Sequence, residues 1–312
     1  MDNAVNQGAK LTLRSAIIVL SASLFYLLLS IALVGFKSDQ LVLIGIFTSL
    51  FFASAITRKF IIGFSIFIVY WIIFDYMKAF PNYNFSTVHI ADLYNLEKKL
   101  FGINFNGQRL TPNEYWRVNG NTFLDVAAGI FYLCWIPVPL AFAAFLFFWN
   151  RKQFLYFSLT FVLVNFIGFI IYYIFPAAPP WYVQSNGFVF HANTHGSTAG
   201  LAKFDLYFHA NIFKSIYAKG SNVFAAMPSL HSSYPVIVLY YGIKNRLGII
   251  NAFFGLVMLG IWCTAVYASH HYVLDVLAGI TCATIGIMLF NYIVSRVNFF
   301  KLFVEKYENI IR

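Results

Sequence analysis

Two short segments of this 312-residue chain place histidine and aspartate side chains where they could carry out nucleophilic chemistry. In SHHYVLDVLAG, residues 269–279, His271 precedes Asp275 by four positions, which puts both side chains on one face of a helix. A carboxylate there can hydrogen-bond one imidazole nitrogen, fix the tautomer, and leave the other nitrogen free as a nucleophile. His270 points about 100° away around the helix, so it cannot share that task.

The second segment is FAAMPSLHSSYP, residues 224–235. Pro228 and Ser229 precede an apolar run, which is a common start of a helix, and His231 then falls in the first turn. The free backbone N–H groups of such a helix start are suited to holding a phosphate. A capped helix with an interfacial histidine is the alternative interpretation. We predict that the catalytic residues are His231, His271 and Asp275. Ser229 and Leu230 are predicted to contact the substrate.

The composition decides which class of protein must position these residues. Hydrophobic residues make up 60% of the chain and charged residues only 10%, whereas an ordinary soluble domain has about 25% charged residues. This excludes soluble globular, disordered and fibrous proteins and predicts an integral membrane protein. The net charge of +10 is spread in ones and twos between apolar runs, which is typical of membrane topology and offers no basic patch for nucleic acid.

We predict an all-α fold, a polytopic membrane helix bundle with about eight transmembrane helices, because a helix needs about 20 apolar residues to cross the hydrocarbon core. The apolar runs lie at 15–36, 41–57, 60–79, 122–148, 154–176, 229–243, 247–268 and 271–294. The chain then divides into N-terminal helices (1–80), an extracytoplasmic or interfacial loop (81–121), a catalytic core (122–295) that includes the outer loop 177–228, and a cytoplasmic tail (296–312). Within the first loop, IADLYNLEKKLFGI is amphipathic and suits a membrane surface.

Lysine and arginine residues set the predicted orientation. If the N-terminus lies in the cytoplasm, the short connections with Arg58–Lys59, Arg151–Lys152 and Lys244–Arg246 all fall on the cytoplasmic side, as does the basic C-terminal tail. This arrangement obeys the positive-inside rule. Both termini are therefore expected to be cytoplasmic, and both histidine segments to lie on the extracytoplasmic side.

Ionisable groups near the outer helix ends are further candidates for substrate binding, because charges at membrane depth are costly and usually functional. These candidates are Asp75, Asp125, Lys219 and His270. Any of the outer-face cations could bind phosphate, and the sequence does not choose among Arg109, Arg117, Lys203, Lys214 and Lys219. His191 and His195 form an HxxxH pair, but they lie in a Gly/Ser/Asn-rich stretch without helical pattern, so we expect no metal and no cofactor.

The motif PSLH, followed further along the chain by HxxxD, resembles the PAP2 (type 2 phosphatidic acid phosphatase) superfamily. Two departures stand out. Ala265 occupies the position of an arginine in that family's last motif, and IFPAAPPW (174–181) replaces its first motif, which contains lysine and arginine. The hydrolytic members use those cations to bind phosphate, which argues against plain lipid phosphatase activity.

A subfamily accounts for these departures. Six segments together resemble the inositol phosphorylceramide synthases of fungi and their bacterial relatives: LEKKLFG (96–102), TPNEYW (111–116), LDVAAGIFYLCWIPVPLAFA (124–143), FPAAPPWY (175–182), AAMPSLHSSYP (225–235) and HHYVLDVLAG (270–279). The resemblance covers roughly residues 90–290 and implies a PAP2-like core. It also implies metal-free transfer of phosphoinositol from phosphatidylinositol to ceramide, with release of diacylglycerol. The active site would face the periplasm in a bacterium or the Golgi lumen in a fungus.

The mechanism expected on this basis is a double displacement, in which His271 attacks the phosphorus of the donor lipid and His231 acts first as acid and then as base. Two alternatives stay open. A hydrolase of lipid or isoprenyl phosphates would use the same three residues with water as the acceptor. A transporter or channel would also explain eight spans with intramembrane acids, but it predicts charged groups near the bilayer midplane, whereas these acids cluster at one face.

Overall fold

The structure is a computed structural model that describes residues 11–218, 220 and 222–312. In the described part of the chain, helices dominate and the only strands form one short antiparallel hairpin, β1 (Ile103–Phe105) and β2 (Gln108–Leu110). This confirms the predicted all-α class. The chain forms two compact units: Met1–Phe80 with Ala143–Val162 and Asn291–Arg312, and Pro81–Phe142 with Leu163–Phe290. Both histidine segments belong to the second unit.

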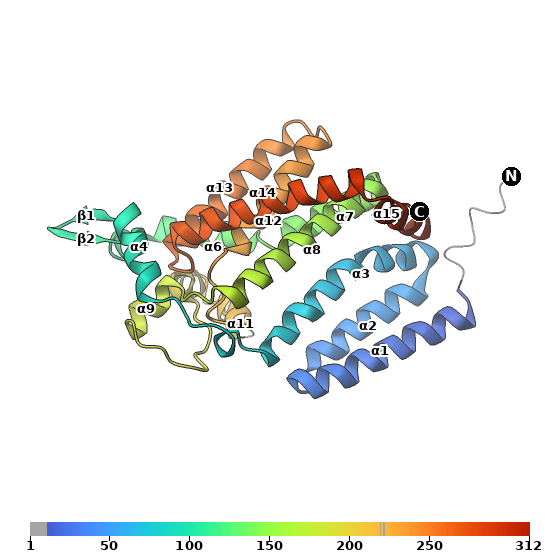
Figure 1. The fold of residues 1–312 in the computed structure, drawn as a ribbon, viewed down its shortest axis with the longest axis horizontal. Coiled ribbons are helices and arrows are strands. Elements are labelled where there is room, and N and C mark those ends of the chain that lie inside the picture. Colours follow the sequence, from blue (N-terminus) through green and yellow to red (C-terminus); the bar gives the residue numbers. More distant parts are fainter. Residues whose placement is uncertain (1–10, 219, 221) are drawn as a thin grey trace. The chain divides into compact units, whose positions relative to one another are not determined.

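The first unit is built on three consecutive helices, α1 (Leu13–Val34), α2 (Ser38–Ala53) and α3 (Ala55–Tyr76), which pack on one another (Figure 1). Capping boxes start α1 at Thr12 and α3 at Ser54, because each side chain accepts a backbone N–H that the first helical turn leaves unpaired. The C-terminal helix α15 (Asn298–Ile311) packs on α3, and the Tyr307 hydroxyl donates to the carbonyl oxygen of Ile62 at 2.7 Å. The predicted tail is therefore largely helical.

The remaining helices lie in the second unit, except that α7 and α8 are each divided about equally between the two units and α14 ends in the first. They are α4 (Ala91–Phe101), α5 (Pro112–Asn119), α6 (Thr122–Leu133), α7 (Pro137–Trp149), α8 (Arg151–Ile174), α9 (Pro180–Asn186), α10 (Ala202–Tyr207), α11 (Ile212–Ala218), α12 (Leu230–Lys244), α13 (Ile250–Tyr267) and α14 (Val273–Arg296). Short 3-10 turns occupy Met77–Ala79, Asn82–Asn84 and Ala199–Leu201. The amphipathic stretch at 91–101 is helical, as expected, and its buried side chains Leu93 and Glu97 pack within the protein.

Six segments of the described residues are long and apolar enough to cross a membrane: Leu13–Val34, Ala55–Ala79, Thr122–Trp149, Arg151–Ile174, Ile250–Tyr267 and Val273–Arg296. The shorter apolar helix α2 corresponds to the second predicted span, and the 15-residue helix α12 occupies the position of the sixth. The fourth span differs from the prediction, because its helix is interrupted between Leu133 and Pro137. Pro137 and Pro139 lack an N–H donor, so the helical hydrogen-bond ladder cannot run unbroken through them.

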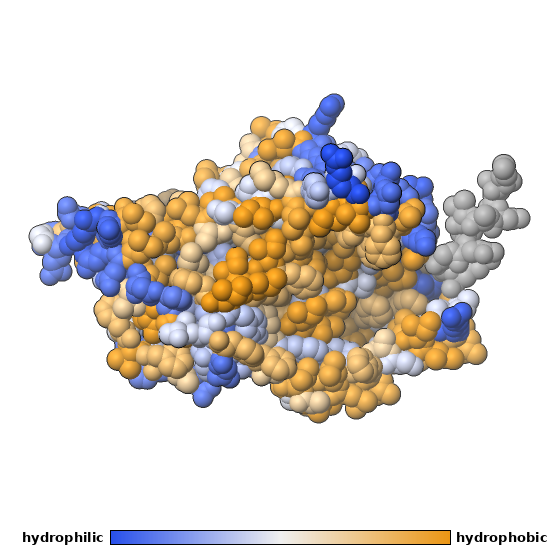
Figure 2. Space-filling model, in the orientation of Figure 1, coloured by the Kyte–Doolittle hydropathy of each residue, from blue (hydrophilic) through white to orange (hydrophobic). Residues whose placement is uncertain are grey.

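Hydrophobic side chains cover most of the visible surface of the helices, whereas hydrophilic ones gather over the β1–β2 hairpin (Figure 2). Large apolar residues on the long helices are exposed, for example Phe25, Phe253 and Met288. A soluble protein would not leave so many large apolar side chains in water. The chain is therefore a multi-pass integral membrane protein.

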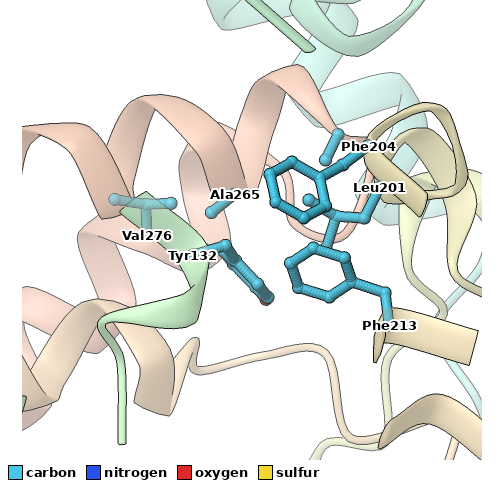
Figure 3. Close-up of a cluster of buried hydrophobic side chains, with 7 residues drawn as sticks. Tyr132, Leu201, Phe204, Phe213, Ala265 and Val276 are labelled. Atoms are coloured by element: carbon cyan, nitrogen blue, oxygen red, sulfur yellow. The ribbon is translucent and has the colours of Figure 1, made fainter. Parts of the chain in front are cut away.

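The second unit has a buried cluster that joins the 177–228 loop to the helices, formed by Tyr132, Leu201, Phe204, Phe213, Ala265, Ala268 and Val276 (Figure 3). Figure 3 shows the rings of Phe204 and Phe213 next to each other, and they pack edge to face, with their planes at 80°. Gly129 of α6 makes this packing possible, because a Cβ at that position would lie 2.0 Å from the Phe204 ring. Leu201, Phe204 and Phe213 thus anchor the 177–228 loop in the helical core.

Candidate active site

The imidazole of His271 is fixed by a backbone carbonyl. Its Nδ1 lies 2.9 Å from the carbonyl oxygen of Ala226, which can only accept, so Nδ1 carries the proton and donates it. The Oδ2 atom of Asp275 lies 3.6 Å from the same nitrogen and accepts the N–H of Tyr272 at 2.8 Å. Because Nδ1 holds the proton, Nε2 of His271 keeps its lone pair.

His231 lies opposite that lone pair. Its Nδ1 is 3.2 Å from Nε2 of His271 and 3.1 Å from the hydroxyl of Tyr132. A bare Nδ1 accepts from the Tyr132 hydroxyl, whereas a protonated Nδ1 can donate to His271. The edge of the Trp135 ring packs on the imidazole of His231 at a centroid distance of 4.3 Å. The structure therefore brings the three predicted catalytic residues together, with Tyr132 and Trp135 beside them.

The two helices that carry these residues meet at their N-terminal ends. The N–H of Ser229 donates to the carbonyl oxygen of Asp275 at 2.9 Å, and the Ser233 hydroxyl donates to the carbonyl oxygen of Gly279 at 2.7 Å. Only glycine fits at 279, because a Cβ there would lie 2.1 Å from the carbonyl oxygen of Ser229. This close approach places the first turn of α12 directly against the first turns of α14.

One part of the predicted phosphate site is wrong. The N–H of Ser229 is not free for phosphate, because it pairs with the backbone of Asp275. The fully buried Ser229 is the N-cap of α12, and its hydroxyl accepts from the backbone N–H of Ser232. The N–H groups of Leu230 and His231, the first two residues of the helix, have no acceptor within it. They remain the candidates for binding an anion there.

Two polar residues that the sequence did not single out hold the segment around His271. Asn113 of α5 donates its amide N–H groups to the carbonyl oxygens of Val266 and His271, at 2.8 and 2.9 Å. Glu97 of α4 accepts the N–H groups of Val273 and Leu274, at 2.9 and 3.2 Å, and so caps the start of α14. Both side chains are 0% exposed. They lie in LEKKLFG and TPNEYW, two segments of the resemblance whose roles the sequence left open.

The carboxyl group of Glu97 has a higher pKa than an exposed glutamate. Burial raises its pKa to about 7, although the two N–H groups that it accepts act in the opposite direction. A buried carboxylate beside a catalytic segment is costly to ionise, so its protonation can change near neutral pH. The strength with which Glu97 caps the start of α14 therefore depends on pH.

A second set of contacts holds the carbonyl of Ala226 in place. The Tyr172 hydroxyl donates to the carbonyl oxygen of Pro228 at 3.0 Å, and Asn82 donates to the carbonyl oxygen of Phe224 at 2.8 Å. Ala177 forms a β-bridge with Ala225. The N–H of Ala177 donates to the carbonyl oxygen of Phe224, and the N–H of Ala226 donates to the carbonyl oxygen of Ala177. The FPAAPP segment thus serves as a backbone support for the histidine site.

The predicted substrate-binding residues are distributed more widely. Asp75 belongs to the first unit and forms an ion pair with Lys78. Asp125 lies 3.4 Å from the Lys203 ammonium and accepts from the Tyr267 hydroxyl at 2.7 Å. Lys219 lies outside the described residues.

The predicted helical spacing of His271 and Asp275 is wrong, because α14 begins only at Val273 and both His270 and His271 precede it. The His271 and Asp275 side chains still meet, and His270 turns away from His271. The His270 ring stacks on the rings of Tyr132 and Tyr217, at centroid distances of 5.5 and 4.5 Å. Nε2 lies 3.1 Å from the carbonyl oxygen of Thr198, and burial lowers the pKa of the imidazole to about 3. His270 therefore stays neutral and ties Thr198 of the 177–228 loop to the catalytic segment.

The remaining candidates lie away from the histidine pair. His191 and His195 are exposed loop residues, and the residues that the structure describes hold no group of three or more His, Cys, Asp or Glu side chains that could bind a metal. Arg109 donates to the carbonyl oxygen of Lys99. Ala265, at the position of the family arginine, is fully buried, and its carbonyl oxygen accepts the N–H groups of His270 and His271.

This geometry suits nucleophilic phosphoryl transfer. A neutral imidazole nitrogen with a free lone pair faces a second imidazole that can give or take a proton. Helix-start N–H groups lie in the same place, where they can stabilise negative charge.

Known proteins share these features. A family model described as the PAP2 superfamily matches residues 107–289. The chain is 46% identical to the phosphoinositol dihydroceramide synthase of Bacteroides thetaiotaomicron, over 92% of this chain and 95% of that protein. It is 27% identical to the inositol phosphorylceramide synthase catalytic subunit of Saccharomyces cerevisiae, over 72% of this chain and 54% of the yeast protein. It is 26% identical to the inositol phosphorylceramide synthase of Candida albicans, over 55% of this chain and 38% of that protein. No solved structure matches significantly.

Proposed function

Because the chain belongs to the PAP2 superfamily, we propose that it is a membrane phosphotransferase that moves phosphoinositol from phosphatidylinositol to the primary hydroxyl of a ceramide and releases diacylglycerol. The relative with 46% identity is named a phosphoinositol dihydroceramide synthase, and the fungal relatives are named inositol phosphorylceramide synthases. Dihydroceramide is therefore the first acceptor to test. The lack of an arginine at Ala265 separates the chain from the hydrolytic pattern.

The observation that carries this proposal is the pairing of His271 with His231. Nδ1 of His271 is bonded to Ala226, so Nε2 is the only nitrogen of this ring with a lone pair. That nitrogen faces Nδ1 of His231 at 3.2 Å. The imidazole of His271 is thus prepared for attack on phosphorus. The imidazole of His231 lies close enough to give a proton to the leaving oxygen or to take one from the acceptor hydroxyl.

In the first half-reaction, Nε2 of His271 attacks the phosphorus of the donor. An N–P bond forms, the bond between phosphorus and the diacylglycerol oxygen breaks, and protonated His231 gives its proton to that oxygen. In the second half-reaction, neutral His231 takes the proton of the ceramide hydroxyl. The ceramide oxygen then bonds to phosphorus, the N–P bond breaks, and both histidines return to their starting states.

Substrate binding must separate the two rings. In-line displacement places the attacking nitrogen and the departing oxygen on opposite sides of phosphorus, with reacting atoms about 3–3.5 Å apart before the step. Two nitrogens 3.2 Å apart cannot at the same time contact opposite sides of one phosphoryl group. The donor therefore replaces the direct contact between His231 and His271 with contacts to itself.

Asp275 and the helix starts support the charges that develop. The carboxylate, 3.6 Å from Nδ1, stabilises the positive charge that His271 acquires when it becomes phosphorylated. The N–H groups of Leu230 and His231 point from a helix start and can stabilise the phosphoryl oxygens. Tyr132 holds His231 in position between the two half-reactions.

We also infer that the site lies on the extracytoplasmic side and that both termini are cytoplasmic. The support comes from the positive-inside pattern of the short connections, such as the one with Lys244 and Arg246 between α12 and α13. The starts of α12 and α14 then face the opposite side, together with the end of α13. Donor and acceptor lipids would both come from that leaflet.

The proposal is tested by product analysis of the purified protein in mixed micelles. Phosphatidylinositol with a labelled headgroup is supplied with dihydroceramide, and the products are identified by mass spectrometry. We expect inositol phosphorylceramide and diacylglycerol in equal amounts. Free inositol phosphate as the main product, unchanged by the acceptor concentration, would instead establish a hydrolase.

A further inference from the structure

The C-terminal helix α15 presents a surface that has no role in the mechanism described above. When its residues are placed at about 100° per residue around the helix axis, they divide into a buried, a polar and an apolar face. Val304 and Ile311 are buried, and Tyr307 lies on the same face, where it contacts α3. The polar residues fall together within one arc of about 100°: Asn298, Lys301, Glu305, Glu308, Asn309 and Arg312.

The remaining face is an uncovered apolar stripe. It consists of Phe299, Phe303 and Ile310, which lie between the buried and the polar faces and are exposed by 79%, 43% and 43%. Leu302, at the border with the polar face, is also exposed. A contiguous stripe of large apolar side chains is unfavourable in water. On a helix whose other side is polar, it is typical of a helix that lies in the plane of a membrane surface.

The contacts of α15 place it at the depth of that surface. Only Val297 separates it from α14, which is long and apolar enough to cross a membrane. Beside the start of α3 (Figure 1), the Tyr307 hydroxyl bonds to the carbonyl oxygen of Ile62 and lies 3.2 Å from the Ser65 hydroxyl. Ile62 follows Arg58 by four residues, so it lies about 6 Å further along the span. Helices in the membrane surface bury their apolar face to about 5–10 Å.

The far end of α15 is fastened to a third span. Nε of Arg151, the first residue of α8, donates to the carbonyl oxygen of Ile311 at 3.2 Å. A cation at the last carbonyl groups of a helix also stabilises the negative end of the helix dipole. The guanidinium itself is held over the ring of Phe147, 3.6 Å from the ring centroid. Tied to α14, α3 and α8 in turn, α15 runs across the ends of these helices and does not extend away from the membrane.

Basic residues surround the helix where phospholipid headgroups would lie. Lys59 and Lys152 follow the starts of α3 and α8, and Arg296 ends α14. Lys306 lies at the border of the apolar stripe, so its stem can follow apolar surface while its ammonium reaches a lipid phosphate. Acyl chains match the stripe, and phosphates match the cations at its border. Phospholipid is therefore the partner whose chemistry fits this surface.

We propose that α15 is an in-plane membrane helix whose Phe299, Phe303 and Ile310 insert among phospholipid acyl chains, in the leaflet where α3 and α8 begin. The segment expected to be a cytoplasmic tail is then part of the membrane-embedded body of the protein. This assignment does not rest on the proposed transferase function.

Nitroxide labels measure what covers the stripe. Full-length protein, with its three native cysteines replaced by alanine, receives one labelled cysteine at a time and is reconstituted in phosphatidylcholine vesicles. Phe303→Cys and Ile310→Cys probe the stripe, and Glu305→Cys and Asn309→Cys, exposed on the polar face of the same helix, are the matched controls. Oxygen concentrates in the bilayer, whereas a nickel chelate stays in water. We expect the ratio of oxygen to nickel collisions to be at least fivefold higher at positions 303 and 310 than at the controls.

Two other outcomes overturn the proposal. Equal ratios at all four positions would show that α15 lies in water. Few collisions with either reagent at positions 303 and 310 would show that protein, such as a second copy of this chain, covers the stripe.

The native chain allows a second measurement without any substitution. Vesicles are prepared with phosphatidylcholine that carries a light-activated diazirine near the top of one acyl chain, and adducts are located by mass spectrometry. Phe299, Phe303 and Ile310 should carry at least fivefold more adduct than Lys301 and Asn309 of the polar face. Equal labelling of both faces, or no labelling of α15, contradicts the proposal. Neither measurement requires turnover, so failure of the transferase function would leave both results unchanged.

Discussion

The Asp275 carboxylate lies 3.6 Å from Nδ1 of His271, whereas the carbonyl oxygen of Ala226 lies 2.9 Å from the same nitrogen. The carbonyl therefore sets the tautomer, and the carboxylate contributes its charge. Where a carboxylate alone sets the tautomer of a catalytic histidine, its replacement by asparagine costs about 10⁴-fold in kcat.

Asp275→Asn should therefore be less damaging here, with a fall in kcat of about 10²-fold, because Ala226 still orients the ring. The measurement is the initial rate of transfer at saturating donor and acceptor, with the thermal unfolding midpoint as a control for folding. A loss of about 10⁴-fold in a folded protein would show that Asp275, and not Ala226, determines the tautomer.

Asn113 is expected to position His271 without touching the substrate. Asn113→Ala leaves the buried carbonyl oxygen of His271 without its donor, at a cost of about 1–3 kcal/mol in the free energy of unfolding, whereas the carbonyl oxygen of Val266 keeps the N–H of Ser269. We expect a lower thermal midpoint and a fall in kcat of at least tenfold, with an unchanged KM for either lipid. Asn104→Ala, an exposed asparagine of the β1–β2 hairpin, is the control and should change neither quantity.

Glu97 should make the stability of the protein depend on pH near neutrality. Its pKa of about 7 in the folded protein lies above the value of 4.5 that it has when exposed, so the folded state binds the proton more tightly. This contribution to stability is complete below about pH 4.5 and is lost as the pH rises through about 7. The midpoint temperature of thermal unfolding should thus decrease as the pH is raised from 5 to 8.

Glu97→Gln should flatten that part of the profile, because the amide can still accept a backbone N–H but does not titrate. The difference between wild type and variant isolates this residue from other titrating groups. If the two proteins lose stability over pH 5–8 with the same slope, Glu97 does not carry the pH dependence.

The sequence was sufficient to place His231, which follows a Pro-Ser helix start and lies in the first turn of α12 as predicted. It identified His271 and Asp275 as partners but not their geometry, because His271 precedes α14, which begins at Val273, so the contact does not come from helical spacing. The partners that hold them are separated by 158 residues for Asn113 with His271 and by 176 for Glu97 with Val273. No local pattern indicates such pairs. The acceptor on Ala226 is a backbone atom, which every residue has, so its role could not be read from residue type.

A contact between residues distant in sequence also explains why the N–H of Ser229 is not free to bind phosphate, as a helix start would predict. A helix start predicts free N–H groups, and this holds for Leu230 and His231. The Ser229 N–H is consumed because Gly279 lets α14 approach closely enough for the carbonyl of Asp275 to accept it. The break between α6 and α7 could have been predicted, since Pro137 and Pro139 are visible in the sequence.

The orientation in the membrane is open to a direct test. A reporter that is active only outside the cytoplasm, inserted after Asn193 in the outer loop, should be active. The same reporter after Asn245, between α12 and α13, should be inactive. The reverse pair of signals would move the histidine site to the cytoplasmic face and overturn the proposed origin of both lipids.

The central claim is that His271 is the nucleophile and His231 the acid and base. His231→Ala should slow transfer by about 10²–10⁴-fold, because it removes proton transfer but leaves the attacking nitrogen. A donor with a leaving group that needs no protonation, such as the nitrophenyl ester of inositol phosphate, should restore the first half-reaction in this variant. The covalent intermediate should then accumulate.

Mass spectrometry of peptides from alkali-quenched reactions with that donor tests the claim most directly, because phosphorus–nitrogen bonds of histidine survive alkali. The account predicts an inositol phosphate adduct on His271 in the His231→Ala protein and no adduct in the His271→Ala protein. An adduct on His231 in the His271→Ala protein would contradict it and exchange the two roles.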